Sequence, residues 1–149
     1  VRCSEDRIVL NDSYNANPDS MKAGLTGLKA WNSNDGKEPF RVALLGAMLE
    51  LGADETALHT SIGTYADELG IDAIIAVGSA QDQHLDALAQ ALADGARQSQ
   101  SASVDCVHDI DAAEQLVIDL ARNHPDAVVL LKGSHASGLS ALAERWAKN

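Results

Sequence analysis

Aromatic residues and cysteines are scarce in this chain of 149 residues. Aromatic side chains make up 3% of the sequence, so the core must be built from Leu, Val, Ile and Ala. The two cysteines, Cys3 and Cys106, lie too far apart to indicate a disulfide framework or a metal site. We therefore expect both to be small apolar residues of a protein in a reducing compartment.

Basic residues are also few, with 11 Lys and Arg against 22 Asp and Glu and a formal net charge of −11. This charge repels nucleic-acid backbones and anionic membrane surfaces, so neither is predicted as a partner. A small anion is still allowed, because helix N-termini and single lysines attract it locally. Long apolar runs and a signal peptide are missing too, which predicts no membrane insertion and a cytoplasmic location. The start at Val1 rather than Met predicts a fragment of a longer protein.

Short apolar, β-branched runs alternate with helical periodicity along the whole chain. Strands are predicted at about residues 7–11, 40–45, 73–77, 104–107 and 127–131, and helices at about 18–31, 55–69, 83–93, 110–123 and 139–147. Continuous apolar strands joined by helices form parallel sheets that are buried on both faces. We expect one domain over residues 1–149, an α/β fold with a doubly wound, mostly parallel, Rossmann-like sheet of five to six strands and helices on both faces.

Two segments of this fold are less regular. Residues 1–4 are a candidate antiparallel edge strand beside the first parallel strand. Residues 94–103 are polar and rich in Ser and Gln, and we expect them to form an exposed, mobile connection.

The most informative loop is NDSYNANPDSM at residues 11–21, between the first strand and the first helix. Asn17 is placed as the N-cap and Pro18 as the first helical residue. The carboxylate and amides of this loop can hold sugar hydroxyls or a base edge, which indicates a nucleotide site. A well-capped turn with no ligand explains the same residues, and both interpretations stay open on these grounds.

Two further loops follow strands at the same edge of the predicted sheet, where ligands of such folds bind. KGSHASG at residues 132–138 combines a cation, hydroxyls and glycines before a helix, which suits a carboxylate or phosphate. GAMLELG at residues 46–52 carries Glu50, which can pair with an ammonium group, and His59 follows in the next helix. A glycine-rich connection and a purely structural histidine are the simpler alternatives. No Walker A loop, nucleophile set or metal cluster is present, so no catalytic residue is predicted.

These three loops, in this order, resemble those of the Mur ligases. The resemblance covers nearly the whole chain, and the string DSYNANPDSM at residues 12–21 is typical of the member that joins D-alanyl-D-alanine to a UDP-N-acetylmuramoyl tripeptide in peptidoglycan synthesis. It implies the C-terminal domain of an ATP-dependent amide ligase of three domains. The N-terminal domain and the central ATPase domain, with its P-loop and Mg²⁺, would be absent from this chain, which alone would be inactive.

The resemblance also implies roles for single residues. Asp12 would hold the ATP ribose, and Tyr14, Asn15 and Asn17 would line the nucleotide. Lys132, Gly133 and Ser134 would bind the carboxylate of the dipeptide. We expect Glu50 to bind its ammonium group, on the electrostatic ground that a zwitterion needs an anionic anchor as well as a cationic one. The supporting residues would be His59, Met48 and His135; relatives often carry Arg or Lys where His135 stands. The domain would bind no metal itself.

Two other functions remain consistent with the sequence. One is a self-contained α/β module that binds a nucleotide or another small ligand without catalysis. The other is a sister ligase of the same family with a different acceptor amino acid, because pocket shape decides acceptor choice and a sequence does not display it.

Overall fold

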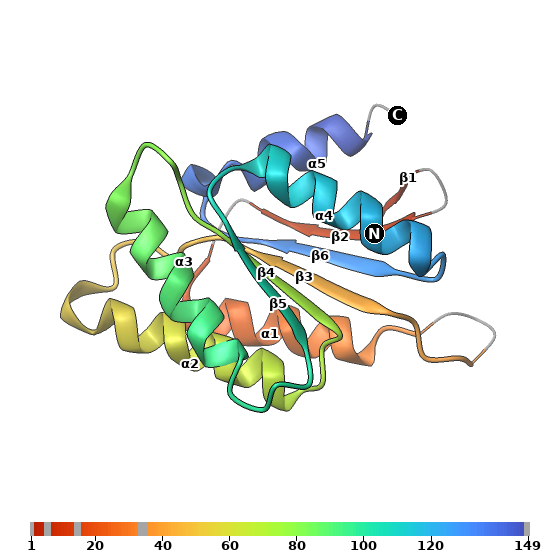
Figure 1. Cartoon of the computed structure of the whole chain (residues 1–149), viewed down its shortest axis with the longest axis horizontal. Coiled ribbons are helices and arrows are strands. Elements are labelled where there is room, and N and C mark those ends of the chain that lie inside the picture. Colours follow the sequence, from red (N-terminus) through yellow and green to blue (C-terminus); the bar gives the residue numbers. More distant parts are fainter. Residues whose placement is uncertain (1, 5–6, 14–15, 33–35, 148–149) are drawn as a thin grey trace.

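The chain alternates strands and helices throughout the computed structural model, which describes all residues except 1, 5–6, 14–15, 33–35 and 148–149 (Figure 1). The strands are β1 (Arg2–Ser4), β2 (Arg7–Asp12), β3 (Arg41–Leu45), β4 (Ala73–Val77), β5 (Ser103–Val107) and β6 (Val128–Lys132). The helices are α1 (Pro18–Ala30), α2 (Glu55–Glu68), α3 (Gln83–Ala96), α4 (Ile110–Asn123) and α5 (Leu139–Ala147), with 3-10 turns η1 (Gly52–Asp54) and η2 (His135–Ser137).

The strands form a six-stranded sheet in the order β1-β2-β6-β3-β4-β5. All neighbours are parallel except β1, which runs antiparallel to β2 at the edge. The predicted doubly wound, mostly parallel α/β sheet is therefore confirmed, and so is its antiparallel edge strand. The last strand, β6, lies between β2 and β3. The connection from β5 to β6 therefore runs back across the sheet, opposite to the direction from β2 through β3 and β4 to β5.

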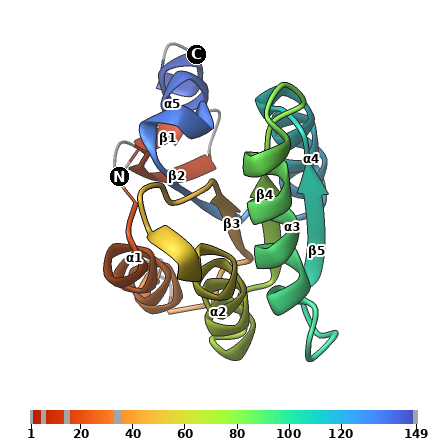
Figure 2. The ribbon, with the colours of Figure 1, turned by 90° about the vertical axis from the view of Figure 1, so that its left-hand side faces the viewer.

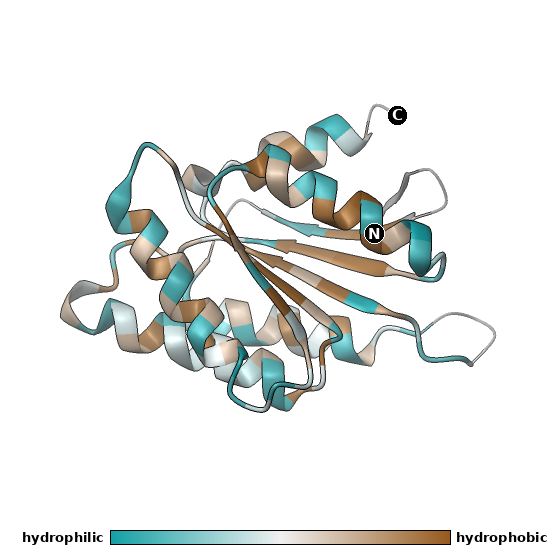
Figure 3. Ribbon diagram, in the orientation of Figure 1, coloured by the Kyte–Doolittle hydropathy of each residue, from teal (hydrophilic) through white to brown (hydrophobic). Residues whose placement is uncertain are grey.

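Helices cover both faces of the sheet, with α1, α2 and α3 on one face and α4 and α5 on the other (Figures 1 and 2). Each face has its own aliphatic core, and β3, β4 and β6 are buried along their whole length. The hydrophobic colours of Figure 3 accordingly concentrate on these central strands. Strands that are buried on both faces have continuous apolar sequences, so these strands could be predicted from the sequence.

The polar segment at residues 94–103 differs from the expectation. Helix α3 continues to Ala96, and Gly95 packs so closely on α2 that a Cβ there would lie 2.1 Å from the Thr60 carbonyl oxygen. Beyond the helix, the backbone N–H and hydroxyl of Ser99 donate to the Asp67 carboxylate at 3.0 and 2.5 Å. Polar composition suggested a mobile connection, but helix contact and these two hydrogen bonds anchor its first half.

Among the residues that the structure describes, no helix is both long enough and apolar enough to cross a membrane.

Candidate functional site at the carboxyl edge of the sheet

The carboxyl ends of β2, β6 and β3 lie side by side. Lys132, the last residue of β6, is in register with Asp12 of β2 and with Leu45 of β3. The pairing continues into the loops, since the Gly46 N–H donates to the Lys132 carbonyl at 2.9 Å and the Ser134 N–H donates to the Ala47 carbonyl at 3.1 Å. The three loops singled out in the sequence therefore meet, whereas β4 and β5 end farther along the same edge.

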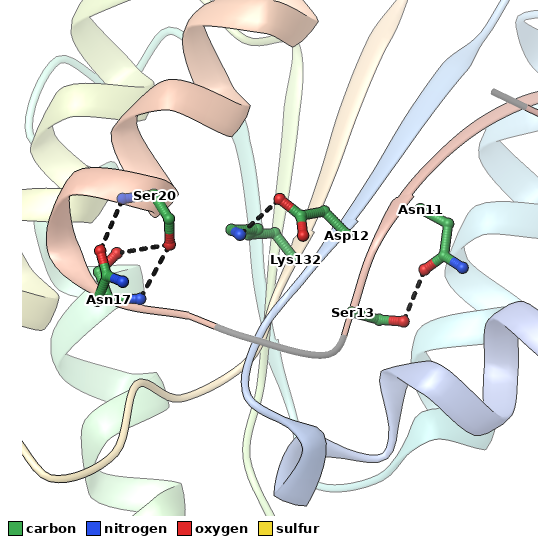
Figure 4. Close-up of polar contacts among 6 residues, drawn as sticks. All are labelled: Asn11, Asp12, Ser13, Asn17, Ser20 and Lys132. Atoms are coloured by element: carbon green, nitrogen blue, oxygen red, sulfur yellow. Dashed lines mark hydrogen bonds and ion pairs between the residues drawn. The ribbon is translucent and has the colours of Figure 1, made fainter.

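An ion pair joins two of these loops. The Lys132 ammonium lies 2.5 Å from Oδ2 of Asp12 (Figure 4). The lysine side chain is only 2% exposed, whereas the Asp12 side chain is 54% exposed. The stem of Lys132 runs beneath α1, where a Cβ on Gly24 would lie 3.6 Å from Lys132 Cδ. The pair thus connects two residues for which the family resemblance implies different ligands.

The loop after β2 ends in a full helix cap. The Ser20 N–H donates to the Asn17 side chain at 2.9 Å, and the Asn17 N–H donates to the Ser20 hydroxyl at 3.0 Å (Figure 4). Upstream, the buried Ser13 hydroxyl donates to the Asn11 side chain at 2.6 Å. The capped turn is confirmed, with Asn17 exposed and its side-chain oxygen occupied by the cap. Tyr14 and Asn15 lie outside the described residues.

The loops after β3 and β6 cross at two glycines. A Cβ on Gly46 would lie 2.4 Å from Ser137 Cβ, and a Cβ on Gly133 would lie 2.9 Å from Gly46 Cα. Neither position has room for a larger residue, because the backbones touch. The contact brings Ser134 and the residues around Gly46 together.

Ser134 supplies an unpaired polar group at this crossing. Its residue is 8% exposed, and its hydroxyl is the one buried side-chain N or O atom of the described residues without a hydrogen-bond partner. Buried hydroxyls are ordinarily paired, so an unpaired one indicates a site where a ligand or water completes the bonding. The side chain of His135, the next residue, lies outside what the structure describes.

His59 holds the loop after β3 from below. Its Nε2 accepts the Met48 N–H at 3.0 Å, and Nδ1 lies 2.7 Å from the Glu55 carbonyl oxygen. An Nε2 that accepts requires the neutral ring with its proton on Nδ1, where it donates to the carbonyl. Burial lowers the pKa of His59, which favours the same neutral form. His59 and Met48 are both fully buried, so they support the loop from the core.

Glu50 sits at the tip of this loop with a solvent-exposed side chain. Its φ of 61° places it in the left-handed region, which costs a non-glycine residue conformational energy. Among the described residues, no hydrogen bond or ion pair involves the Glu50 carboxylate. The structure therefore leaves Glu50 open to solvent and does not connect it to Lys132 or Ser134.

Two residues that shape the site were missed in the sequence. The Ser137 hydroxyl donates to the Ser134 carbonyl at 2.7 Å and accepts the Leu139 N–H at 3.3 Å, so it ties the loop to α5. Gly24 of α1 faces the stem of Lys132, where an added Cβ would make an ordinary contact of 3.6 Å with Cδ. A glycine inside a helical pattern was the available signal, because glycine disfavours helices.

Within the described ranges, no three His, Cys, Asp or Glu side chains are grouped as a metal ion would need. The arrangement has instead a carboxylate, a buried cation and an unpaired hydroxyl, next to two buried glycines where the loops cross. Such a set can bind hydroxyl and carboxylate groups of a ligand.

A family model described as "Mur ligase, glutamate ligase domain" matches residues 1–135. The chain belongs to this Mur ligase family. The resemblance that the three loops indicated is thereby confirmed.

Curated relatives agree on one member of the family. The UDP-N-acetylmuramoyl-tripeptide–D-alanyl-D-alanine ligase of Mycobacterium leprae is 37% identical over 145 residues, which cover 91% of this chain and 27% of the relative. The enzyme of the same name from Mycobacterium tuberculosis is 38% identical over 142 residues, covering 91% of this chain and 28% of the relative. This Mur ligase domain thus spans between a quarter and a third of the length of these relatives.

Solved structures agree on the fold. A crystal structure of MurF from Acinetobacter baumannii matches 100% of this chain and 30% of that chain, with a TM-score of 0.76 and 24% identity. MurF from Thermotoga maritima in complex with ADP matches 99% of this chain and 30% of that chain, with a TM-score of 0.68 and 22% identity. At these identities the likeness supports the fold of this Mur ligase domain.

Proposed function

We propose that this chain is the C-terminal, substrate-positioning domain of an ATP-dependent ligase that adds D-alanyl-D-alanine to a UDP-N-acetylmuramoyl tripeptide. The observation that carries the proposal is the unpaired, buried Ser134 hydroxyl beside the Lys132–Asp12 pair, on the three loops that the family motifs occupy. The names of the relatives at 37–38% identity support the choice of acceptor. The product would serve peptidoglycan precursor synthesis in the cytoplasm, where ATP is available.

Asp12 is the centre of the proposed nucleotide site. One of its carboxylate oxygens accepts from Lys132, and the half-exposed carboxylate keeps its other oxygen for a ribose hydroxyl. Asn17 lies at the start of α1, and we propose that it lines the nucleotide together with Tyr14 and Asn15. The ATP molecule would be shared with a central domain of the same polypeptide.

The acceptor is a zwitterion and needs two kinds of anchor. We propose that its carboxylate binds at Ser134 and the Gly133 backbone, in the loop that follows Lys132. Glu50, exposed and without a partner in the described chain, would then receive the ammonium group once the domain closes on its neighbours. Met48 and His59 support the Glu50 loop from the core, and His135 would flank the carboxylate.

The chemistry itself would take place beside this domain. The carboxylate of the tripeptide attacks the terminal phosphorus of ATP, ADP leaves, and the dipeptide amine then displaces phosphate from the acyl phosphate and loses a proton. Mg²⁺ would neutralise phosphate charge in the central domain, in keeping with phosphoryl transfer generally. The described residues of this chain offer no metal-ligand group and would position the reactants only.

The test is a coupled assay of the full-length protein with ATP, the tripeptide precursor and D-alanyl-D-alanine. We expect phosphate release that requires all three substrates, and a product whose mass has increased by the dipeptide less one water. The 149-residue chain alone should form no product. Amide formation by this chain alone would contradict the proposed division of labour.

A panel of acceptors separates the remaining alternatives. A sister ligase would use a single amino acid in place of D-alanyl-D-alanine with the same ATP dependence. A self-contained binding module would take up ATP tightly as the isolated chain and release no phosphate in any combination.

A further inference from the structure

The environment of Lys132 does not match that of a residue whose main task is to meet an incoming carboxylate. Its side chain is 98% shielded from solvent, its stem is packed under α1 at Gly24, and its ammonium already holds a carboxylate. A buried ammonium requires an anion close by, because an uncompensated charge in a low-dielectric interior is costly. Asp12 is that anion.

The two partners of the pair are unequal. Asp12 is 54% exposed and stays hydrated if Lys132 is removed, whereas Lys132 is 2% exposed and loses its anion if Asp12 is removed. Their Cα positions are in register on adjacent parallel strands, so both side chains emerge on the same face of the sheet. The lysine thus holds one oxygen of the Asp12 carboxylate (Figure 4), and the half-exposed side chain leaves the other oxygen accessible.

We propose that Lys132 is a positioning residue of the nucleotide side of the site: it acts through Asp12 and does not itself anchor the acceptor. Lys132 holds the Asp12 carboxylate in one orientation, with one oxygen bound and one oxygen presented to a ribose hydroxyl. The acceptor carboxylate is then held by Ser134 and the backbone at Gly133. This inference rests on the proposed function, which it deepens by reassigning one residue.

The first test measures unfolding of the 149-residue chain in urea. Asp12→Asn leaves a buried ammonium without its anion and should lower the unfolding midpoint clearly. Lys132→Met replaces the buried stem with an apolar side chain of similar length and should lower the midpoint less. The double variant should be more stable than Asp12→Asn alone, because it no longer buries an ammonium that has lost the Asp12 carboxylate. A double variant less stable than Asp12→Asn would overturn the dependence of Lys132 on Asp12.

The second test measures the ligase kinetics of the full-length protein, a readout that a merely structural pair would not move selectively. Lys132→Met should raise the KM for ATP about tenfold, the loss of one charge-assisted contact, and leave the KM for D-alanyl-D-alanine within about twofold. Ser134→Ala should show the opposite split. Lys22→Met, an exposed lysine above the Tyr65 ring, is the matched control and should change neither constant.

The outcomes separate the two proposals. A dipeptide KM that rises with Lys132→Met as much as the ATP KM or more, or an unchanged ATP KM, overturns the role assigned to Lys132 and leaves the ligase function standing. Absence of amide product from the unmodified full-length protein overturns the ligase function instead, and the urea experiment then still decides whether Asp12 sustains the buried lysine.

Discussion

Two buried cations lie at opposite edges of the sheet, and they are held in different ways. Arg41 opens β3 at the amino edge and Lys132 closes β6 at the carboxyl edge, and each is 2% exposed. Arg41 donates through Nε to the Leu28 carbonyl at 2.9 Å and through Nη2 to the Trp31 carbonyl at 2.8 Å. Lys132 donates to a carboxylate that is half exposed.

The acceptors explain the difference. Backbone carbonyls at the end of α1 need donors, so Arg41 completes the bonding of the helix, and its own N–H donates to Asp72 at 2.9 Å. Lys132 instead pairs with a side chain that still has bonding capacity toward solvent. The hydrogen bonds of Arg41 are all made within the fold, so we infer a structural role for it. The carboxylate bound to Lys132 can still bond to a ligand.

The amino edge also has a hollow of about 310 Å³, lined by charged residues and by Phe40 stacked on His124 with ring centroids 3.6 Å apart. The carboxyl edge has the unpaired Ser134 hydroxyl. A hollow with charged walls would by itself point to the amino edge. The unpaired Ser134 hydroxyl and the family motifs both point to the carboxyl edge instead. We regard a buried hydroxyl without a partner as the better indication of a ligand site here.

Replacement of Arg41 should have the largest effect on stability. Arg41→Met removes the side-chain donors of two carbonyls at the end of α1, and the Leu28 carbonyl then keeps only the Trp31 N–H at 3.3 Å, so we expect a loss of about 3 kcal/mol in the free energy of unfolding. Urea denaturation of the chain measures it, with Arg122→Met as control, an exposed arginine 3.7 Å from Asp119 that should change stability by less than about 0.5 kcal/mol. Equal losses in both variants would contradict the structural role of Arg41.

The glycine crossing should come next. Gly133→Ala places a methyl group 2.9 Å from Gly46 Cα and from the Ser137 hydroxyl, so the loops must separate. We expect a loss of about 2 kcal/mol, within the usual range for overpacking, together with weaker acceptor binding in the full-length protein. Gly27→Ala on α1, where a Cβ would meet nothing within 4 Å, is the control and should be neutral or stabilising. A neutral Gly133→Ala would argue against the tight crossing.

His59 gives a smaller effect that depends on pH. The folded state keeps a lowered pKa, so as pH falls below the ordinary value of 6.5 the unfolded chain takes up a proton that the folded chain does not. The stability due to neutral His59 is therefore present above about pH 6.5 and lost as pH falls.

His59→Gln isolates this contribution, because a glutamine oxygen can accept the Met48 N–H at any pH. Wild type and variant should differ by about 1 kcal/mol at about pH 7.5, and wild type should lose stability relative to the variant toward about pH 5.5. Glu55 and His84 face His59 and are the same in both proteins, so the difference removes their effect. A difference independent of pH would contradict a buried neutral His59.

The sequence was sufficient for most of the fold because the central strands are uniformly apolar and the helices periodic. It could place the Asp12, Gly46 and Lys132 loops at one edge, but not next to one another. Their adjacency follows from the insertion of β6 between β2 and β3, which depends on long-range pairing. The pairing of Lys132 with Asp12, across 120 positions of sequence, is a consequence of that insertion.

Local signals are less decisive at the site itself. Asn17 is predicted as a helix cap and the structure confirms the cap, which occupies its side-chain oxygen, whereas its place at the nucleotide stays a prediction. The sequence leaves Lys132 either solvated or bound to a ligand. Its burial beneath α1 could not be predicted, because lysines rarely lie inside a protein.

Ser134→Ala should have the smallest effect on stability and a clear effect on function. The Ser134 hydroxyl has no partner in the described structure, so its removal takes away no internal hydrogen bond and should change the free energy of unfolding by less than about 0.5 kcal/mol. In the full-length protein the KM for D-alanyl-D-alanine should rise about tenfold while the KM for ATP stays unchanged.

Ser61→Ala is a matched control, because Ser61 is exposed on α2 and its hydroxyl donates to the Leu58 carbonyl of the same helix at 2.7 Å. A loss of stability with an unchanged KM would mean that Ser134 serves the fold as Arg41 does, and the contrast between the two edges would fail.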